Sequence, residues 1–595
     1  MPMTTTGRKT ARSPCRSAAA RSISSWTRQD RSGKRLGHAL TWLGQRDAGI
    51  TLTAPRCAQA VRILSRDREI ILKQWYTVWR WVWLASVVIT LGWGSGPAAL
   101  QAAVPASPAI APPSAGTFLP VLRSGVAPLC RFGVNGAIKS YPVQPLRISW
   151  YVDYGATAND NPPSGIDYYP MIRLEQIGDS YSYSLSPSRT PVTDADLAAV
   201  IDAHPGTYWF IGNEPDRKQY QDDIEPQVYA RAYHDLYLRI KRQDPTAKIV
   251  AGTIVQPTPV RLQYLDLVLE AYYEQYLTRM PVDVWSFHNF ILNEANCAYY
   301  SKLYPDRPDY VNSICWGADI PPGLDEIADG LRIDVQDNDD IELFKQQVVA
   351  FRQWMAERGY RNTPVFLSEF GILMPQGLFS PDFDAARVNA FMDASFDFLL
   401  NTTDPEIGYP GDGNRLVQRF SWYSVEDKVD HNGYLFDNAL PANSSRTVYG
   451  NNFADYTNRL QEEIDFYPLR LSQVGTPPLI SQGATTVTLE AVIANSGNLA
   501  NPQPVEVRFY RGNPAAGGKP IGDPQPITLA GCGEQQTVRL EWPNVAPGNY
   551  TIFVVVDPGK QVGETDEDNN SLSTMVRFAK HRVQVPLLFS PLNLR

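Results

Sequence analysis

Two short apolar stretches, far apart in the chain, each end in a glutamate followed by a turn residue. The first, residues 208–216, reads Tyr-Trp-Phe-Ile-Gly-Asn-Glu-Pro-Asp, and the second, residues 364–371, reads Pro-Val-Phe-Leu-Ser-Glu-Phe-Gly. Aromatic and β-branched runs of this length, bounded by turn residues, predict buried strands. Pro215 cannot continue a central ladder, so the first strand ends at Glu214. Such strands bring their glutamates face to face only in a closed or doubly wound sheet.

An isolated Asn-Glu-Pro is equally compatible with a glutamate that only caps the next helix. The second stretch favours a shared site instead, because a parallel α/β barrel places its chemistry at the carboxyl ends of its strands. By strand count Glu214 ends the fourth strand and Glu369 ends the seventh. Both side chains are then expected to point into the mouth of the barrel from opposite walls.

Length and composition restrict the class of protein. The 595 residues are too many for one ordinary domain, and a hydrophobic content of 43% is enough for sizeable cores. The formal net charge is -8 although basic residues crowd the first eighty positions, so the remainder is more acidic than the total. This balance argues against nucleic acid as a partner. The 14 Trp and 30 Tyr exceed what a core needs and suit the flat faces of sugar rings, although many are simply core.

The amino-terminal region predicts export. Residues 1–70 are basic, rich in Ser and Thr and without apolar periodicity, so they read as a disordered leader or as sequence upstream of the true start. Residues 71–106 have a basic flank, an apolar centre over 75–103 and small residues at the end, which is typical of a signal peptide or a single membrane anchor. Residues 107–127 form a Pro/Ala/Ser-rich linker. Both interpretations place the rest of the chain outside the cytoplasm, secreted or attached to the membrane.

Residues 128–466 alternate between strand and helix patterns. Helical periodicity separates most of the strands, so the strands are predicted to run parallel, as in a (β/α)₈ TIM barrel. Short gaps after the first two strands predict loops or single turns there. The predicted strands are 131–137, 146–153, 169–174, 208–212, 248–254, 282–287, 364–369 and 417–423.

Residues 467–580 change to period-two alternation, broken by Asn, Gly and Pro turns. This pattern predicts an all-β Ig-like sandwich after the barrel, so the chain is multidomain. The tail, residues 581–595, is basic and apolar and supports no interpretation.

Six cysteines occur, and none has the spacing of a zinc site. Cys297 and Cys315 flank one polar, aromatic loop and are a candidate disulfide in an exported chain. Cys130 and Cys532 have no evident partner in the sequence. No metal and no cofactor are expected.

Two opposed glutamates suit hydrolysis of a glycosidic bond. That reaction needs a proton donor on the leaving oxygen and a carboxylate across the sugar, held about 5–5.5 Å apart in retaining enzymes. The acid is expected to have the higher pKa and the nucleophile to stay ionised. Asn213, beside Glu214, can hydrogen-bond a sugar hydroxyl, which favours Glu214 as the acid and leaves Glu369 as the nucleophile.

Asn213-Glu-Pro and Ser368-Glu-Phe together resemble the retaining clan A glycoside hydrolases. Within that clan, residues 130–460 look most like the glycosyl hydrolase catalytic core family of endo-β-1,3-glucanases. The order of the strand motifs carries this resemblance: Ser149-Trp-Tyr, Tyr168-Tyr-Pro-Met, Asn213-Glu-Pro-Asp, Asp283-Val-Trp-Ser-Phe-His and Pro364-Val-Phe-Leu-Ser-Glu-Phe.

The resemblance implies Glu214 as acid/base and Glu369 as nucleophile. It implies that His288 hydrogen-bonds at the end of strand six and that Trp422 is a sugar platform on strand eight. From the residues alone, His288 is as readily a rim histidine without a substrate contact. Judged from the residues alone, Trp422 is at least as readily a core residue as a sugar platform.

Trp150, in the first of these strand motifs, and Arg173, near the predicted mouth, are further candidate substrate-binding residues. Two departures concern the substrate: Phe290 stands where the family usually has a tyrosine, and Ile172-Arg173 replaces an expected aromatic residue. Arg173 near the mouth would suit a decorated or acidic glycan. The rims also carry competing acids that end no clear strand, namely Asp153, Glu294, Glu426 and Asp427.

Motifs of the carboxy-terminal region resemble the CARDB-type Ig-like domain of bacterial surface proteins. They are Asn495-Ser-Gly-Asn, Pro547-Gly-Asn-Tyr and the closing run Glu564-Thr-Asp-Glu-Asp-Asn-Asn570. The acidic run is either a calcium ligand set or, more simply, a solvated turn. The resemblance implies a spacer or adhesion role without chemistry of its own.

We therefore expect an extracellular retaining glycoside hydrolase with a polysaccharide substrate, a β-1,3-linked glucan being favoured. Two alternatives remain: a non-catalytic glycan-binding surface protein, and the same type of enzyme acting on another hemicellulose.

Overall fold

The computed structural model describes residues 127–579, except 179–181, 187–192, 220, 427–430, 438–444 and 476–483. The predicted leader, the signal or anchor segment at 75–103, most of the linker and the tail lie outside these residues. Within the described part of the chain, no helix combines the length and the apolar character needed to cross a membrane.

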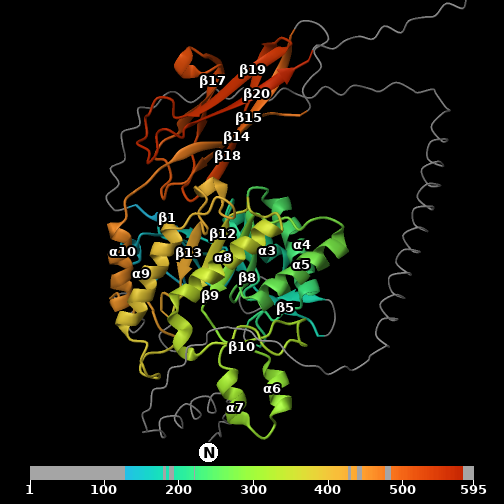
Figure 1. The fold of residues 1–595 in the computed structure, drawn as a ribbon, viewed down its shortest axis with the longest axis vertical. Coiled ribbons are helices and arrows are strands. Elements are labelled where there is room, and N and C mark those ends of the chain that lie inside the picture. The colour runs from blue at the N-terminus through green and yellow to red at the C-terminus, as the bar shows by residue number, and fades with distance from the viewer. Residues whose placement is uncertain are drawn as a thin grey trace, which may run out of the picture. The chain divides into compact units, whose positions relative to one another are not determined.

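A parallel sheet of nine strands forms the centre of the amino-terminal domain (Figure 1). Its spatial order is β3-β2-β1-β13-β12-β9-β8-β7-β4. The strands are β1 (Leu129–Asn135), β2 (Ile148–Val152), β3 (Asp167–Tyr168), β4 (Met171–Ile172), β7 (Tyr208–Ile211), β8 (Lys248–Ile254), β9 (Val284–Asn289), β12 (Val365–Phe370) and β13 (Arg419–Trp422).

The third predicted strand is split into two halves. β3 pairs with β2, and β4 pairs with β7, so the same chain segment borders both ends of the sheet. Only Tyr169 and Pro170 separate the halves. The architecture is thus TIM-like, with one interrupted strand where the sheet begins and ends.

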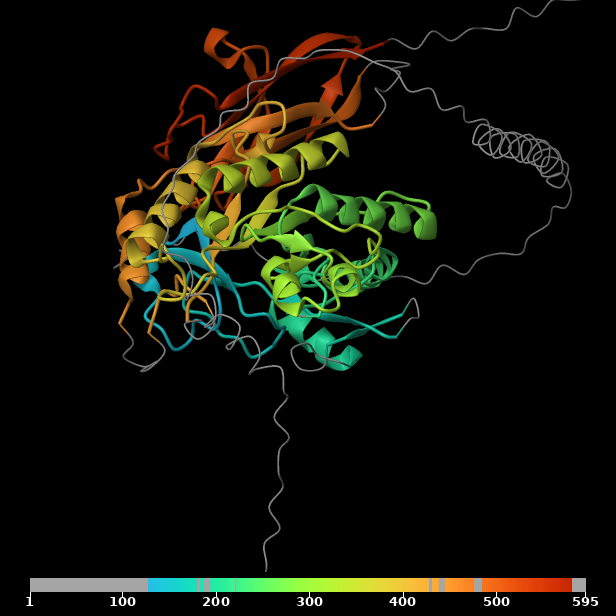
Figure 2. The same cartoon turned by 60° about the horizontal axis from the view of Figure 1, so that its bottom comes forward.

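Helices cover the outer side of this sheet (Figure 2). Thr193 caps the first of them by accepting a hydrogen bond from the Asp196 backbone N–H. Between β1 and β2 the chain makes only the single turn η2 (Gln144–Leu146), which confirms the short gap. The helices are α3 (Asp194–Ala203), α4 (Pro226–Gln243), α5 (Pro259–Tyr276), α8 (Ile341–Glu357), α9 (Ala385–Asn401) and α10 (Val448–Arg459).

Side chains of the strands alternate between two cores. One set packs between the sheet and the helices, and the other fills the interior of the curved sheet. The interior set includes Trp150, stacked on Tyr169 with ring centroids 5.2 Å apart. Gly133 on β1 is required there, because a Cβ would lie 2.4 Å from the Trp150 ring.

A β-bulge in β12 sets the direction of Glu369. Leu367 pairs with Phe287 and Glu369 with His288, so β12 holds one residue more than β9 over this step. Without the bulge, alternation from the inward Phe366 would turn Glu369 outward. With it, Glu369 points inward and Phe370 packs outward among the helices. The sequence pattern did not predict this feature.

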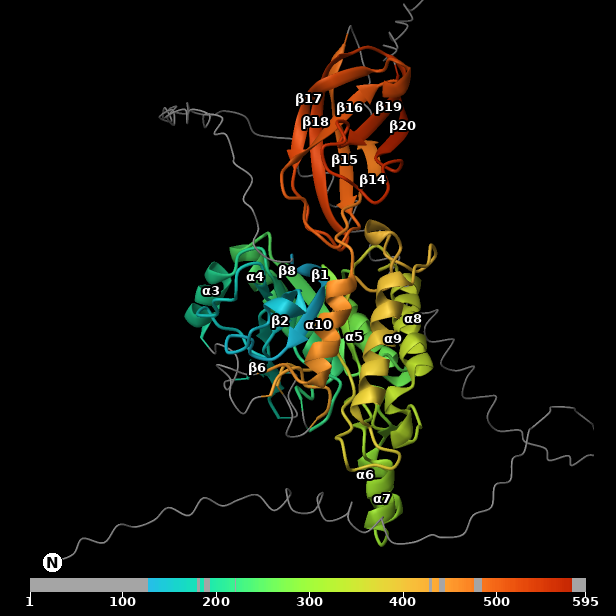
Figure 3. The same cartoon turned by 90° about the vertical axis from the view of Figure 1, so that its left-hand side faces the viewer.

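A long insert follows β9. It contains β10 (Glu294–Ala295), α6 (Cys297–Leu303), α7 (Pro308–Ile314), β11 (Ala318–Asp319) and η3 (Val335–Asp339). β10 and β11 pair, and the helices α6 and α7 lie side by side as a hairpin that projects from the domain (Figures 1 and 3). A disulfide joins Cys297 to Cys315 at the base of this hairpin, the pairing that the sequence suggested.

The carboxy-terminal domain is an antiparallel sandwich with its own core, as predicted. One sheet has the order β14-β15-β18, and the other has the order β17-β16-β19-β20. The strands are β14 (Phe466–Gln473), β15 (Thr485–Asn495), β16 (Val505–Arg511), β17 (Lys519–Ile527), β18 (Glu534–Val545), β19 (Gly548–Val556) and β20 (Ser571–Phe578).

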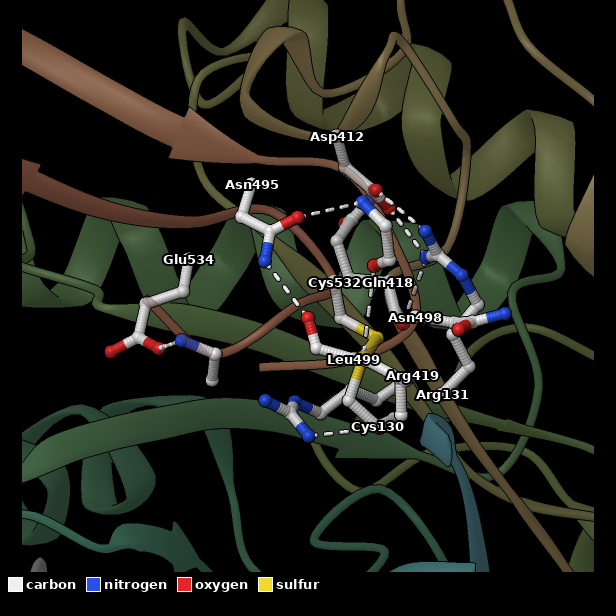
Figure 4. The surroundings of a disulfide bond; sticks show 12 residues. Cys130, Arg131, Asp412, Gln418, Arg419, Asn495, Asn498, Leu499, Cys532 and Glu534 are labelled. Atoms are coloured by element: carbon white, nitrogen blue, oxygen red, sulfur yellow. Dashed lines mark hydrogen bonds and ion pairs between the residues drawn. A yellow bond between two sulfur atoms is a disulfide. The ribbon is translucent and has the colours of Figure 1, made fainter. Parts of the chain in front are cut away.

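A second disulfide joins Cys130 on β1 to Cys532 of the sandwich (Figure 4). The sequence had left both cysteines without a partner, because 402 residues separate them. Beside the disulfide, the buried Arg131 makes two hydrogen bonds to Asp412, of 2.7 and 2.8 Å, and donates a third to the Ser496 carbonyl. The sandwich therefore contacts the amino-terminal end of β1 and the turn before β13.

The disulfide between Cys130 and Cys532 is expected to stabilise the protein more than the local one does. Loop-closure entropy predicts that replacing both cysteines by serine lowers the free energy of unfolding by about 6 kcal/mol, against about 3 kcal/mol for Cys297→Ser with Cys315→Ser. Urea unfolding of the full-length variants measures both losses. An equal or larger loss in the local pair would contradict the expectation.

Candidate active site

Glu214 and Glu369 meet in the interior of the sheet, with His288 between them. Nδ1 of His288 lies 3.0 Å from Oε1 of Glu214, and Nε2 lies 3.3 Å from Oε1 of Glu369. One carboxylate oxygen of each glutamate and a ring nitrogen of His288 all lie within 4.8 Å of one another. The sequence thus identified three residues that the fold brings together from β7, β9 and β12.

Glu214 is the carboxylate that stays ionised in the empty site. Its burial favours the neutral form, but the Arg217 guanidinium, 3.1 Å away, and the His288 ring outweigh burial and lower the pKa of Glu214 to about 2. Glu214 has a φ of 45°, and its backbone N–H donates to the Thr253 carbonyl, which fixes the residue directly after the end of β7.

Glu369 is the carboxyl that holds a proton near neutral pH. Burial and the nearby negative charge of Glu214 raise the pKa of Glu369 to about 7, against the lowering effects of His288 and Arg173. The pKa of His288 is also raised, since the two carboxylates outweigh the burial of its ring. The ring therefore lies between two acids that cannot both be charged in so dry a place without a neighbouring cation.

A layer of small polar groups lies beneath the acids. The hydroxyls of Ser286 and Ser368 are 2.7 Å apart, and Asn135 donates to the Ser368 carbonyl. Ser421 in turn donates to the Asn135 side chain over 2.8 Å. These buried groups satisfy one another and give the site a fixed floor.

Three further residues reach the site, and the sequence analysis missed them. Arg217 follows Glu214 by three residues on the same turn, a spacing that could have been recognised. Tyr154 lies close enough to Glu369 to affect its pKa by hydrogen bonding, and it continues the inward phase of Trp150 and Val152. Tyr423, half-buried at the mouth, contacts Phe290 with ring centroids 5.6 Å apart.

Asn213 and Arg173 are organised by the buried Asp222. That carboxylate accepts hydrogen bonds from the backbone N–H of Asn213 at 2.8 Å and from Nε of Arg173 at 2.6 Å. The Asn213 side chain donates to Gln221, and its buried Oδ1 has no hydrogen-bond partner in the described structure. The charge of Arg173 is therefore already neutralised by Asp222, which argues against an acidic glycan.

Two predicted substrate-binding residues are corrected. Trp422 is fully buried on the helix side of β13, and its Nε1 donates to the Gly433 carbonyl, so it is not a sugar platform. Alternation places Tyr423, and not Trp422, on the inner face. Trp150 points inward but is fully buried one layer beneath the mouth, where it fills the interior instead of meeting substrate.

The competing acids have other partners. Asp153 accepts from the Tyr168 hydroxyl, and Glu426 is bonded to Tyr141. Glu294 is fully buried against Arg261, which also binds Asp216 over 2.6 Å. Asp427 lies outside the described residues.

The triad of Asp216, Arg261 and Glu294 braces the turn that carries Glu214. All three side chains are fully buried, and they come from that turn, from α5 and from the insert, respectively. Removing one member of such a group would leave an uncompensated buried charge, so the triad holds the three segments together.

Glu214, His288 and Glu369 are also, among the described residues, the group with the atoms to ligate a metal ion. Each ring nitrogen already faces a carboxylate oxygen, and Arg217 adds a positive charge beside Glu214. His288 thus bridges the two carboxylates, and the positive charge of the Arg217 guanidinium disfavours a metal cation between them.

Comparison with known proteins assigns the carboxy-terminal domain. The CARDB family matches residues 471–574, so the predicted CARDB domain is confirmed and lies within 467–580. The CARDB domain of a Pyrococcus furiosus protein, solved with di-metal ions, is similar at 20% identity and a TM-score of 0.17, covering 20% of this chain and 99% of its own. A CARDB domain favours an extracellular or cell-surface location.

The solved structures similar to the amino-terminal region include glycosidases and an oligosaccharide-binding protein of family GH128 from Trichoderma gamsii. An endo-β-1,3-glucanase of family GH128, subgroup II, from Pseudomonas viridiflava has 16% identity and a TM-score of 0.33, covering 55% of this chain and 96% of its own. A glucosidase from Croceicoccus marinus has 11% identity and a TM-score of 0.34, covering 77% and 95%. No curated protein matches the chain.

The opposite pKa shifts predict opposite stability effects for two matched variants. A carboxyl group whose pKa is raised in the native state lowers the free energy of unfolding as pH rises above about 4.5, its pKa in the unfolded chain. This loss of stability is complete near pH 7. Glu369→Gln is therefore expected to raise the free energy of unfolding at pH 7 by up to about 3 kcal/mol, and by little at pH 4.5.

Glu214→Gln is the control with the opposite sign. A lowered pKa stabilises the native state above about pH 4.5, and this contribution is lost as pH falls toward 2. The Glu214 variant should therefore be less stable than the wild type at pH 7. Urea unfolding at both pH values tests the pair, and shifts of the same sign would contradict this electrostatic account.

Proposed function

We propose that the protein is an extracytoplasmic retaining glycoside hydrolase that cleaves a β-linked polysaccharide by double displacement, on a sheet that closes as a (β/α)₈ barrel. The observation that carries the proposal is the pair of buried glutamates, with oxygens within 4.8 Å and a histidine between them. Retaining enzymes separate their carboxyls by about 5–5.5 Å and inverting ones by about 6.5–9.5 Å. The short separation favours the retaining mechanism.

The roles of the two acids follow the sequence resemblance, with Glu214 as acid/base and Glu369 as nucleophile. The pKa values have the opposite order, because that of Glu369 is raised to about 7 and that of Glu214 is lowered to about 2. His288 offers a direct route between them, because its two ring nitrogens face one oxygen of each acid. When the ring is neutral with its proton on Nδ1, Glu369 can give its proton to Nε2 while Nδ1 passes its own proton to Glu214. This leaves a charged nucleophile, a protonated acid and a neutral ring with its proton on Nε2.

Arg217 must release Glu214 for this transfer. Its side chain is one fifth exposed, so a sugar that enters beside Glu214 can displace it toward solvent. The pKa of Glu214 then rises, because its main cationic neighbour is gone. Glu214 protonates the leaving oxygen as Glu369 attacks the anomeric carbon, and Glu214 then takes a proton from the water that releases the sugar.

A β-1,3-glucan is the favoured substrate, on the strength of the sequence resemblance. The pairing of Arg173 with Asp222 supports a neutral chain over an acidic one. Tyr423, and not the predicted Trp422, serves as the sugar platform, because the Tyr423 ring is partly exposed at the mouth.

The full-length protein should release reducing sugar from one neutral β-glucan in a polysaccharide panel. Glu369→Gln should lower this rate by about 10⁴-fold or more on any substrate, since the covalent step is lost. Glu214→Gln should lose the polymer but keep activity on an aryl glycoside with a good leaving group, which needs no acid. Steady-state rates on both substrates measure the difference.

Glu342→Gln, an exposed glutamate on α8, is the matched control and should behave as wild type. Proton NMR of the first product should show the anomer of the substrate, and the opposite anomer would refute retention. Polysaccharide binding without release of sugar would establish the alternative, a non-catalytic glycan-binding protein. Activity on another hemicellulose alone would keep the mechanism and change the substrate.

A further inference from the structure

The hairpin of α6 and α7 displays a row of tyrosines to solvent. Tyr299 is 45% exposed and Tyr310 is 37% exposed, and no residue of α6 is buried. The rings follow one another: Tyr299 and Tyr300 have centroids 5.3 Å apart, Tyr300 and Tyr304 are parallel at 6.5 Å, and Tyr304 meets Tyr310 at 5.0 Å. An exposed aromatic group of this size on a folded domain marks an interaction site.

The hairpin is held rigidly. The disulfide between Cys297 and Cys315 closes its base, and the Asn293 side chain donates to the Ile314 carbonyl over 2.6 Å. The Tyr300 hydroxyl donates to Asp329, with both carboxylate oxygens within 2.9 Å. Rings that are already fixed lose little conformational freedom when a ligand binds.

An apolar cluster connects the base of the hairpin to the candidate active site. Phe290 and Leu292, the first residues of the insert, are buried together, and Tyr423 at the mouth packs against them. Trp316, which directly follows the clamping Cys315, packs against the same cluster from the other side. The insert that carries the tyrosine row therefore also packs against Tyr423 at the mouth.

We propose that the α6–α7 hairpin is an accessory binding site for the chain of a neutral polysaccharide, with Tyr299 and Tyr310 as stacking residues and the Arg307 guanidinium over one face of the Tyr310 ring. Flat rings pack against the C–H faces of sugars, and the phenolic hydroxyls bond sugar hydroxyls. The hairpin balances Lys302 and Arg307 against Asp306 and Asp309, so it offers no net charge to an anionic polymer or lipid surface. The choice of a neutral glycan rests on the proposed function.

Tyr299→Ala combined with Tyr310→Ala tests this site, since both rings are exposed and their loss leaves the core intact. Tyr273→Ala, which removes a 60% exposed tyrosine on α5, is the matched control. The full-length proteins are compared by affinity electrophoresis in soluble β-1,3-glucan and by hydrolysis of that polymer and of a short aryl glycoside. Loss of two stacking contacts should weaken polymer binding by about tenfold.

The double variant should also show a raised KM for the polymer, with an unchanged rate on the short glycoside. Wild-type polymer binding in the double variant would overturn the hairpin site, and so would an equal loss in the Tyr273 variant. These outcomes are separate from the fate of the enzyme. A wild type that binds the polymer through the hairpin but cleaves nothing refutes the proposed function alone, whereas cleavage with unaltered binding refutes the hairpin alone.

Discussion

The interior of the sheet holds two carboxyl groups within a few ångströms of each other, where water cannot screen them. Two like charges in such surroundings repel strongly, so at least one acid must be neutralised or must keep its proton. His288 and Arg217 meet this requirement unequally, since both face Glu214 and only the ring faces Glu369. The difference between the two acids is therefore built into the positions of two basic side chains, His288 and Arg217.

The rest of the domain keeps these groups in register. The bulge in β12 turns Glu369 inward, and the polar layer formed by Ser286 and Ser368 supports it from below. The buried triad around Arg261 fixes the turn after β7 to α5 and to the insert. One segment, the insert, thus both braces the turn that carries Glu214 and presents the tyrosines of the α6–α7 hairpin.

Much of this arrangement could be predicted from local pattern. Strands that end in glutamate placed Glu214 and Glu369 together, and the family resemblance added His288 at the end of β9. The alternation of inward and outward side chains along β13 would also have predicted that Trp422 faces the helices and not the interior of the sheet. The bulge in β12 could not be predicted, because it depends on pairing with β9 and leaves no mark on the local pattern. The partner of Cys130 was equally hidden, since it lies 402 residues away.

The disulfide between Cys130 and Cys532 also constrains how the chain matures. Cys130 belongs to the first strand of the sheet, whereas Cys532 is made only when most of the sandwich has been synthesised. The bond therefore cannot form until nearly the whole chain has emerged, and it needs an oxidising compartment to persist. The first strand of the glutamate-bearing domain thus gains its covalent link only after a domain that carries none of the site's residues has been made. A product truncated before residue 532 would lack that link.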